Sequence, residues 1–379
     1  MRIFENIHID WMGKRKVFYI VSAVLFFLGL INILIRGLEF GIDFKGGSEI
    51  VLQFDKPIDI AKIRTEVDKL GLGTVELKTF GGDNTVLIRT EMQSIPNELY
   101  PKVIKSIQDE IDKAIPGVVR SITDSAQNSI TFTLPNPDTT NILVEKLSEA
   151  GFQSGKVSEE PTNTQILVSV GISDWIKENL KAKFQDNPFK VLKEDQVGPK
   201  VGSELKRDAV LAVLLSLVAI LIYLAFRFKF IFATGAVLAL FHDVLITLGL
   251  YALLYGVIPG LNLEIDLSIV AAFLTLVGYS INDTVIVFDR VRENLKIHKT
   301  KPLFDVMNMS INRTMSRTII TSGTTLLAVI VILLFGGEVL RPFAFTLAFG
   351  IIIGTYSSIF VASALVLEYV NKTKKKVEF

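Results

Sequence analysis

The sequence predicts a polytopic α-helical membrane protein with six transmembrane helices and an extracytoplasmic α+β, ferredoxin-like domain between the first two of them. Three observations predict this class. Half of the 379 residues are hydrophobic. These residues gather in six blocks of about 18 residues or more, the length that a helix needs to cross a bilayer. The one long segment outside the blocks is rich in charge and alternates between strand and helix patterns.

Each of the six hydrophobic blocks is predicted to be a membrane-spanning helix. The first block follows Lys14-Arg15-Lys16, as the core of a signal peptide would. It is longer than a typical signal core, however, and no small-x-small cleavage site follows it, so we expect a retained anchor. The blocks cover residues 17–35, 209–226, 231–255, 267–288, 318–335 and 343–370.

The distribution of Lys and Arg predicts the orientation, because short cytoplasmic segments are enriched in these residues. The N-terminal tail, the turn after the second block, the link between the fourth and fifth blocks and the C-terminus all carry them, whereas loop 256–266 has none. We therefore expect a protein of the inner (cytoplasmic) membrane with both termini in the cytoplasm. The predicted regions are a cytoplasmic tail (1–16), the first span (17–35), a periplasmic domain (36–206), five spans (207–370) and a cytoplasmic tail (371–379).

The periplasmic segment shows the order βαββαβ twice, and this order is typical of a ferredoxin-like unit. We therefore expect two such units in tandem, and one larger α+β domain with a single sheet is the alternative. The first unit is predicted as strand 48–54, helix 58–70, strands 74–79 and 85–90, helix 97–115 and strand 118–124. The second is predicted as strand 129–134, helix 138–150, strands 153–158 and 164–170, helix 173–184 and strand 190–197.

Ionisable residues inside the hydrophobic blocks are the main functional candidates. His242 and Asp243 lie in the third block, Asp283 in the fourth and Arg317 at the start of the fifth. A charge at membrane depth costs about 3 kcal/mol or more unless it is paired, neutralised or hydrated, and such residues often mark ion or proton paths. A polar contact between helices is the structural alternative.

Polar residues on the same helix faces favour a shared path. Residues three and four positions apart lie on one face of a helix, and this spacing places several polar side chains beside the candidates. They are Thr247 in the third block, Tyr279, Ser280 and Thr284 in the fourth, and Arg313, Thr321, Thr324 and Thr325 in the fifth. We expect Asp283 to be ionised beside Arg317, so that protonation would release the arginine and break a pair worth about 3–5 kcal/mol when buried. In the last block, Gly350, Gly354 and Ser358 predict close helix packing.

Several classes of function are disfavoured. The chain has no cysteine, and therefore no disulfide and no thiolate nucleophile. It has no phosphate-binding loop, no nucleophile elbow and no zinc-binding His pair. We therefore expect no enzyme, no cofactor, no metal site and no nucleic-acid partner, and we expect energy to come from an ion gradient or a partner protein.

Six sequence motifs together resemble the SecF family, the membrane subunit of the bacterial SecDF protein-export complex. The stretch that begins at Val277 is the most specific of them. The motifs are Phe40-Gly-Ile-Asp-Phe-Lys-Gly-Gly-Ser, Val197-Gly-Pro-Lys-Val-Gly-Ser-Glu-Leu, His242-Asp243, Glu264-Ile-Asp-Leu-Ser-Ile-Val-Ala, Val277-Gly-Tyr-Ser-Ile-Asn-Asp-Thr-Val-Ile-Val-Phe-Asp-Arg-Val-Arg-Glu-Asn and Asn312-Arg-Thr-Met-Ser-Arg-Thr-Ile-Ile-Thr-Ser-Gly-Thr-Thr.

The resemblance implies a heterodimer with SecD, related to RND transporters, that assists the SecYEG channel and the SecA motor in the export of unfolded preproteins, powered by the proton gradient. YajC and YidC are further implied partners. The family's aspartate and arginine of the proton path match Asp283 and Arg317. Candidate supporting residues are His242, Asp243, Tyr279, Ser280, Asn282, Thr284, Thr321 and Thr325. Motif residues with an expected structural role are Gly41, Asp43, Gly46, Gly47, Gly198, Pro199, Asp289 and Arg290.

The chain departs from the family pattern in two places. Lys45 stands where a small hydroxylated residue is common, and the periplasmic domain is longer than a single ferredoxin-like unit. One alternative function is an RND-like half-transporter that exports small molecules or lipids, although such transporters usually carry about twice as many spans in one chain. Another is an intramembrane aspartyl protease that uses Asp243 and Asp283, but Asp283 lacks the Gly-x-Gly-Asp setting of those enzymes.

Overall fold

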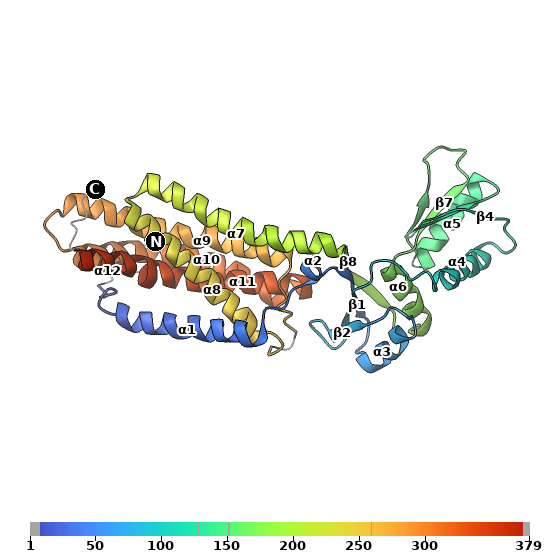
Figure 1. Cartoon of the computed structure of the whole chain (residues 1–379), viewed down its shortest axis with the longest axis horizontal. Coiled ribbons are helices and arrows are strands. Elements are labelled where there is room, and N and C mark those ends of the chain that lie inside the picture. Colours follow the sequence, from blue (N-terminus) through green and yellow to red (C-terminus); the bar gives the residue numbers. More distant parts are fainter. Residues whose placement is uncertain (1–7, 127–128, 151, 259, 374–379) are drawn as a thin grey trace. The chain divides into compact units, whose positions relative to one another are not determined.

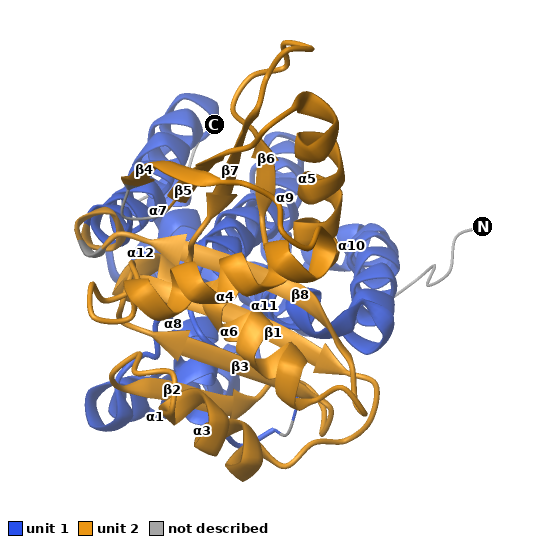
Figure 2. Cartoon of the chain, turned by 90° about the vertical axis from the view of Figure 1, so that its right-hand side faces the viewer, with its two compact units in different colours: residues 1–41, 204–379 blue, residues 42–203 orange. Residues whose placement is uncertain are grey.

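The structure is a computed structural model that describes residues 8–126, 129–150, 152–258 and 260–373. The chain divides into two compact units (Figures 1 and 2). The membrane unit comprises Met1–Gly41 and Glu204–Phe379, and the inserted unit comprises Ile42–Ser203. Parts of both predicted cytoplasmic tails, 1–7 and 374–379, lie outside the described residues.

The six predicted spans are all helices long and apolar enough to cross a membrane. They are α1 (Arg15–Arg36), α7 (Pro199–Arg227), α8 (Phe230–Leu254), α9 (Leu267–Ile297), α10 (Leu303–Phe335) and a last helix made of α11 (Gly337–Ser357), the π-helical turn η1 (Ser358–Ala362) and α12 (Ser363–Thr373). Helices α9 and α10 extend well beyond their hydrophobic blocks, because polar residues can continue a helix once it has left the bilayer. The last span is the most enclosed, with 78% of its apolar window buried, against 6% for α1.

Glycines permit the closest helix contacts in the membrane unit. A Cβ atom on Gly350 would lie 2.2 Å from Leu276 Cδ1, and one on Gly354 would lie 2.8 Å from Ser280 Cβ. The predicted small-residue stripe on the last span is therefore a packing surface against α9. Likewise, Gly29 of α1 meets Gly249 of α8 backbone to backbone, where a Cβ on Gly29 would lie 2.8 Å from Gly249 Cα.

The inserted unit holds two four-stranded antiparallel sheets. The first has the order β2-β3-β1-β8 and the second the order β4-β5-β7-β6. The strands are β1 (Gly47–Phe54), β2 (Val75–Thr79), β3 (Thr85–Thr90), β4 (Ser121–Ala126), β5 (Ser129–Thr133), β6 (Ser154–Lys156), β7 (Gln165–Ser169) and β8 (Phe189–Val197). The helices are α2 (Ile42–Lys45), α3 (Ile60–Asp68), α4 (Tyr100–Ala114), α5 (Pro137–Ala150) and α6 (Ile172–Lys183).

The pairing of the strands corrects the tandem arrangement. The first sheet is completed by β8, from the end of the unit, and the second by β4, from its first half. Helix α6 accordingly lies against α3, and α4 lies against α5. The two ferredoxin-like units thus exchange their last helix and strand, and both sheets share one apolar core. Sequence patterns locate strands but do not state their partners, which is why this exchange was missed; the single-sheet alternative is wrong as well.

Candidate functional site

Asp283 is buried between three helices of the membrane unit. It lies on α9, and its side chain is 2% exposed. Its Oδ2 atom accepts hydrogen bonds from Ser322 of α10, at 3.0 Å, and from Thr355 of α11, at 3.2 Å. The two hydroxyl oxygens also lie 3.0 Å apart, so the single proton of Thr355 can be donated either to the carboxylate or to Ser322. The carboxylate and the two hydroxyls therefore form a closed triangle that joins α9, α10 and α11.

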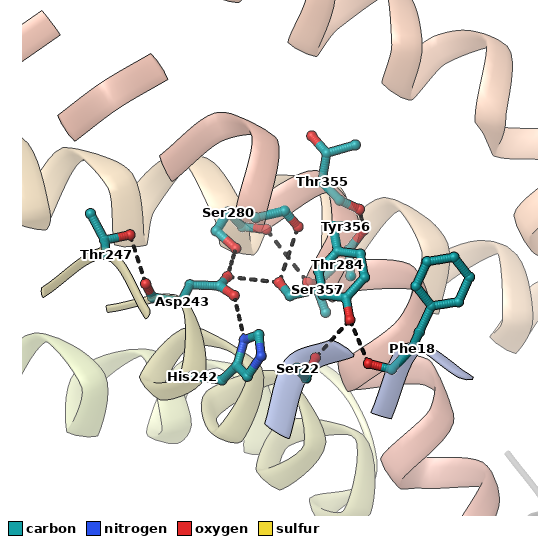
Figure 3. A network of polar contacts seen from close by, with 12 residues as sticks. Phe18, Ser22, His242, Asp243, Thr247, Ser280, Thr284, Thr355, Tyr356 and Ser357 are labelled. Carbon is teal, nitrogen blue, oxygen red and sulfur yellow. Dashed lines mark hydrogen bonds and ion pairs between the residues drawn. The ribbon is translucent and has the colours of Figure 1, made fainter. Parts of the chain in front are cut away.

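Asp243 forms a second polar network, drawn in Figure 3. It lies on α8 and is fully buried. Ser280 of α9 and Ser357 of α11 both donate to its Oδ2 atom at 2.7 Å. Its Oδ1 atom lies 3.0 Å from Nδ1 of His242, whose Nε2 atom is buried without a hydrogen-bond partner among the described residues. Among the described residues the two carboxylates have separate hydrogen-bond partners, whereas the two carboxylates of an aspartyl protease share one proton.

Three consecutive residues of α11 connect the bundle. Thr355 contacts Asp283, and Ser357 contacts Asp243. Between them, Tyr356 donates to the carbonyl of Phe18 and hydrogen-bonds Ser22, both on α1 and both at 2.7 Å (Figure 3). The π-helical turn η1 begins directly after these residues, and such turns occur often at functional sites. A shift of α11 at this point would therefore act on both carboxylates and on α1 together.

The structure does not form the predicted ion pair between Asp283 and Arg317. Among the described residues, no Lys or Arg nitrogen lies within 4.0 Å of either buried carboxylate. Arg317 is exposed on α10. The helix period explains the difference: Ser322 faces Asp283, and the residue that shares its face one turn away is Thr318, not Arg317.

The other predicted supporting residues fall into two groups. Tyr279 donates to the Thr321 carbonyl at 3.1 Å and to the Thr325 hydroxyl at 3.2 Å, so these three residues join α9 to α10. Thr284 is buried and bonds back to the Ser280 carbonyl within α9. Asn282 is exposed and belongs to neither network.

Sequence reasoning missed five hydroxyl residues of the site. They are Ser22, Ser322, Thr355, Tyr356 and Ser357. Uncharged hydroxyl residues are common in membrane helices, so they carry no signal comparable to that of an aspartate. Two clues were available: the run Thr355-Tyr-Ser-Ser358 in a mainly apolar block, and the spacing of four residues between Thr318 and Ser322.

The motif glycines have structural roles where the chain enters and leaves the inserted unit. Gly46 and Gly47 have φ values of 77° and 117°, which favour glycine. A Cβ atom on Gly47 would also lie 2.2 Å from the Thr90 carbonyl oxygen. On the exit side, a Cβ atom on Gly202 would lie 3.2 Å from the carbonyl oxygen of Phe44 and 3.3 Å from that of Asp43. The two motifs therefore pack on each other, with Gly198 preceding Pro199, the first residue of α7.

The remaining motif residues hold loops and helix ends of the membrane unit. Gly41 donates its backbone N–H to the Ile265 carbonyl at 2.8 Å. Asp289 of α9 accepts two hydrogen bonds from Arg227 of α7, at 2.9 and 3.0 Å, and Arg290 pairs with Glu293 within α9. We find no group of three or more His, Asp or Glu side chains that could hold a metal ion in the described ranges.

The inserted unit buries charges in a different way. Glu49 of β1 and Arg89 of β3 are 3% and 5% exposed and face each other across the first sheet. Arg89 Nε lies 2.8 Å from Glu49, and Arg89 Nη1 lies 3.2 Å from Glu76 of β2. On the other side of Glu49, Lys193 of β8 lies at 3.2 Å. Opposite charges therefore alternate across all four strands.

Comparisons with known proteins agree with this architecture. The family model described as protein export membrane protein SecD/SecF, C-terminal, matches residues 176–372, and that of the SecD/SecF GG motif matches residues 31–58. The protein translocase subunit SecF of Rhodothermus marinus is 42% identical over 97% of this chain and 95% of its own length. That of Calditerrivibrio nitroreducens is 39% identical over 99% and 97%. Because these alignments run through the inserted unit, its enlarged form is shared with these relatives.

A solved structure gives the same fold. The crystal structure of SecDF, a translocon-associated membrane protein from Thermus thermophilus, superposes with a TM-score of 0.64 at 29% identity. The match covers 97% of this chain but only 39% of the SecDF chain, so this protein corresponds to about two fifths of that molecule. Family model, relatives and structure agree: the chain belongs to the SecF family of protein translocase subunits.

Proposed function

We propose that this chain works with a SecD protein to promote export of unfolded preproteins through the SecYEG channel, using the proton gradient as its energy source. One observation carries the energetic part of this proposal. Asp283 is buried at membrane depth, and its hydrogen-bond partners are neutral hydroxyls from two other helices. A carboxylate in such surroundings can gain or lose a proton without leaving an opposite charge buried and unpaired.

The proposed step is a change in the direction of the hydrogen bonds. In the ionised state Asp283 accepts from Ser322 and Thr355. Once protonated, its own hydroxyl donates to one of them, since Ser and Thr hydroxyls both donate and accept. We propose that Thr355 receives this hydrogen bond, which changes the bonding of the α11 segment that also contacts Asp243 and α1. One charge that crosses the membrane supplies about 2.3 kcal/mol per 100 mV, a magnitude comparable to that of a few hydrogen bonds.

We propose that Arg317 has an indirect role in proton transfer at Asp283. It lies exposed on α10, and among the described residues no ion pair joins it to Asp283, so any effect on the carboxylate is that of a charge at longer range. We assign no hydrolytic activity, in keeping with the translocase-subunit names of the relatives. Asp243, His242 and the hydroxyls around them are proposed to support the path from α8.

The distribution of Lys and Arg supports an orientation with both termini in the cytoplasm of a bacterial cell and the inserted unit outside the inner membrane. In that orientation the inserted unit stands where exported chains emerge. SecA, YajC and YidC are proposed partners on the strength of family membership alone.

The experiment is export of a periplasmic reporter in cells depleted of the native protein. Wild type, Asp283→Asn and Arg317→Met are compared with and without an uncoupler, and co-purification with SecD verifies assembly. Asp305→Asn, at an exposed carboxylate of α10, is the matched control. We expect Asp283→Asn to lower export to the uncoupled level, Arg317→Met to lower it partly, and Asp305→Asn to leave it unchanged. Normal export by Asp283→Asn would overturn the proposal.

A further inference from the structure

The inserted unit contains a pocket that is a candidate binding site. The pocket has a volume of about 250 Å³ and lies between α3, the start of α4 and α6. Its apolar lining comes from Leu70, Leu99 and Trp175. Leu70 and Trp175 are 6% and 8% exposed, so they form a fixed apolar wall.

The rim of the pocket carries an excess of positive charge. Lys69, Lys102 and Lys183 line it, with Glu66 as the one acidic residue. Glu66 is already paired with Lys69 at 2.6 Å. Lys102 and Lys183 are exposed, and within the part of the chain that the structure describes neither has an ion-pair partner within 4.0 Å. Two ammonium groups are therefore available to a ligand.

Trp175 completes the apolar wall with its ring. Its indole N–H is fully buried, so the carbon surface of the ring, and not the N–H, faces the pocket. Together, the apolar wall and the two ammonium groups describe a site for a molecule that is apolar in one part and carries carboxylates in another.

The size of the pocket favours one side chain of a larger molecule. Sites for small organic ligands usually have volumes of about 300–1,000 Å³, and this pocket is smaller. A large apolar side chain exposed next to acidic residues is a feature of an unfolded polypeptide, because folding buries such side chains.

We propose that this pocket binds a segment of unfolded polypeptide in which a large apolar side chain is flanked by acidic residues. The apolar side chain lies against Leu70, Leu99 and Trp175, and the flanking carboxylates pair with Lys102 and Lys183. The inference rests on the proposed function, since exported preproteins are the unfolded chains that such a unit meets. It specifies where on this chain, and to which sequences, that contact is made.

The test uses the full chain in nanodiscs of zwitterionic lipid. The protein has two tryptophans, so the variant Trp11→Phe leaves Trp175 as the single fluorescent reporter. Three short synthetic peptides are titrated, in which Phe alternates with Glu, with Gln or with Lys. We expect a saturable change in Trp175 emission with the Phe/Glu peptide, affinity weaker by about tenfold or more with the Phe/Gln peptide, no binding of the Phe/Lys peptide, and loss of affinity as salt is raised.

Charge variants locate the site. Lys102→Glu combined with Lys183→Glu is expected to weaken binding of the Phe/Glu peptide by about tenfold or more. Lys105→Glu is the matched control, because Lys105 is also exposed on α4 but does not line the pocket. If Lys105→Glu weakens peptide binding as much as the double variant does, the attraction is a general electrostatic one and the proposed pocket is overturned. Peptide binding that leaves Trp175 emission unchanged would also overturn the proposed pocket. Displacement of the peptide by phosphatidylglycerol vesicles alone would overturn it as well. Circular dichroism verifies that the variants are folded.

The two proposals fail in distinguishable ways. Peptide binding requires neither SecD nor a proton gradient, so it should persist in Asp283→Asn. Loss of export in Asp283→Asn together with absent peptide binding in the wild type would remove the pocket and leave the proton proposal standing. Peptide binding together with normal export by Asp283→Asn would remove the proton proposal and leave the pocket standing.

Discussion

The two units of this protein bury charged side chains by opposite means. In the inserted unit, Glu49 is held by Arg89 and Lys193, both of opposite charge. In the membrane unit, Asp283 is held by the hydroxyls of Ser322 and Thr355. Both carboxylates are almost fully enclosed. They differ in whether a fixed positive charge stands beside them.

The difference indicates which carboxylate can change its state. Protonation of Glu49 would break its ion pairs with Arg89 and Lys193, although Arg89 would keep Glu76 and Lys193 would keep Asp195, and breaking a buried ion pair costs several kcal/mol. Protonation of Asp283 leaves only hydroxyls, which turn their hydrogens to match. We therefore expect the charge pairs to keep Glu49 ionised and its sheet rigid, and the neutral partners to let Asp283 change between its ionised and its protonated state. The predictions below alter one partner at a time.

The largest effect is expected when a positive charge is placed beside Asp283. Ser322→Lys would give this carboxylate the kind of partner that Glu49 has, and would hold it ionised. We expect gradient-dependent export to fall to the level of uncoupled cells while co-purification with SecD continues. Ser322→Ala, which removes one hydroxyl but leaves Thr355, should retain a substantial part of the activity. If Ser322→Lys exports like wild type, the state of Asp283 is irrelevant to export.

The next largest effect is expected in the row of alternating charges that crosses the first sheet, formed by Glu76, Arg89, Glu49 and Lys193. Arg89→Met leaves Glu49 buried with Lys193 as its one remaining ion-pair partner among the described residues, and should lower the free energy of unfolding of the inserted unit by about 3–5 kcal/mol. Chemical denaturation of the full chain, followed through Trp175 in the Trp11→Phe background, measures this. The double variant Glu49→Leu/Arg89→Met should recover most of the loss. A loss below about 1 kcal/mol in the single variant would contradict the proposed rigidity.

A pH effect is expected at Glu178 of α6, the acidic residue of the inserted unit that comes closest to the behaviour proposed for Asp283. Its Oε2 atom is buried without a hydrogen-bond partner among the described residues. Burial, together with the negative charges of Glu110 and Asp109 and against the positive charge of Lys113, raises the pKa of Glu178 from 4.5 to about 7. Between these two values the folded chain keeps a proton that the unfolded chain has lost, so stability falls as the pH rises through this window.

Glu178→Gln should remove this slope. We expect the variant to unfold at a higher temperature than wild type above about pH 7, and at nearly the same temperature below about pH 4.5, where both states of the wild type are protonated. Thermal unfolding of the full chain at a series of pH values measures the difference. Glu159→Gln, at an exposed carboxylate of the same unit, is the control and should leave the slope in place.

The smallest effect is expected at the exposed pair between Arg227 and Asp289. Both side chains are about 40% exposed, and pairs of this kind contribute about 0–1 kcal/mol. Arg227→Ala should therefore change the thermal stability of the membrane unit only slightly and leave export intact. A large loss would show that charge pairs outside the bilayer also hold the bundle in its working arrangement.

Much of the membrane unit could be predicted from the sequence. A run of apolar residues long enough to cross a bilayer has few alternatives to a helix, so all six spans were located. Asp243 and Asp283 were conspicuous because charge is costly in such a run. The partners of Asp283 were not predictable in the same way: Arg317 drew attention through its charge, whereas Ser322 and Thr355, which make the contacts, resemble many other hydroxyl residues in the helices.

The inserted unit was predictable in its parts but not in its connections. The eight strands and helices α3, α4, α5 and α6 were located with shifts of a few residues, because alternating and helical patterns are local properties, whereas the four-residue helix α2 was not predicted. The partners of β4 and β8 depend on contacts between residues far apart in the chain, and β4 fits the edge of either sheet by pattern alone. Only the shared core, in which residues such as Ile50 and Phe132 belong to one cluster, decides between the arrangements.

The exchange of β4 and β8 has a consequence for biogenesis. Strand β1, near the start of the inserted unit, is flanked by β3 and β8, and β8 is the last strand to be synthesised. Until it arrives, β1 is an open edge, which invites pairing with other chains. Only Gly198 separates β8 from α7, so the unit closes at the moment when the second span is made. The inserted unit is therefore completed when the second span, α7, inserts into the membrane. A chain that ends before β8 keeps β1 as an open edge, by which quality control can recognise it as unfinished.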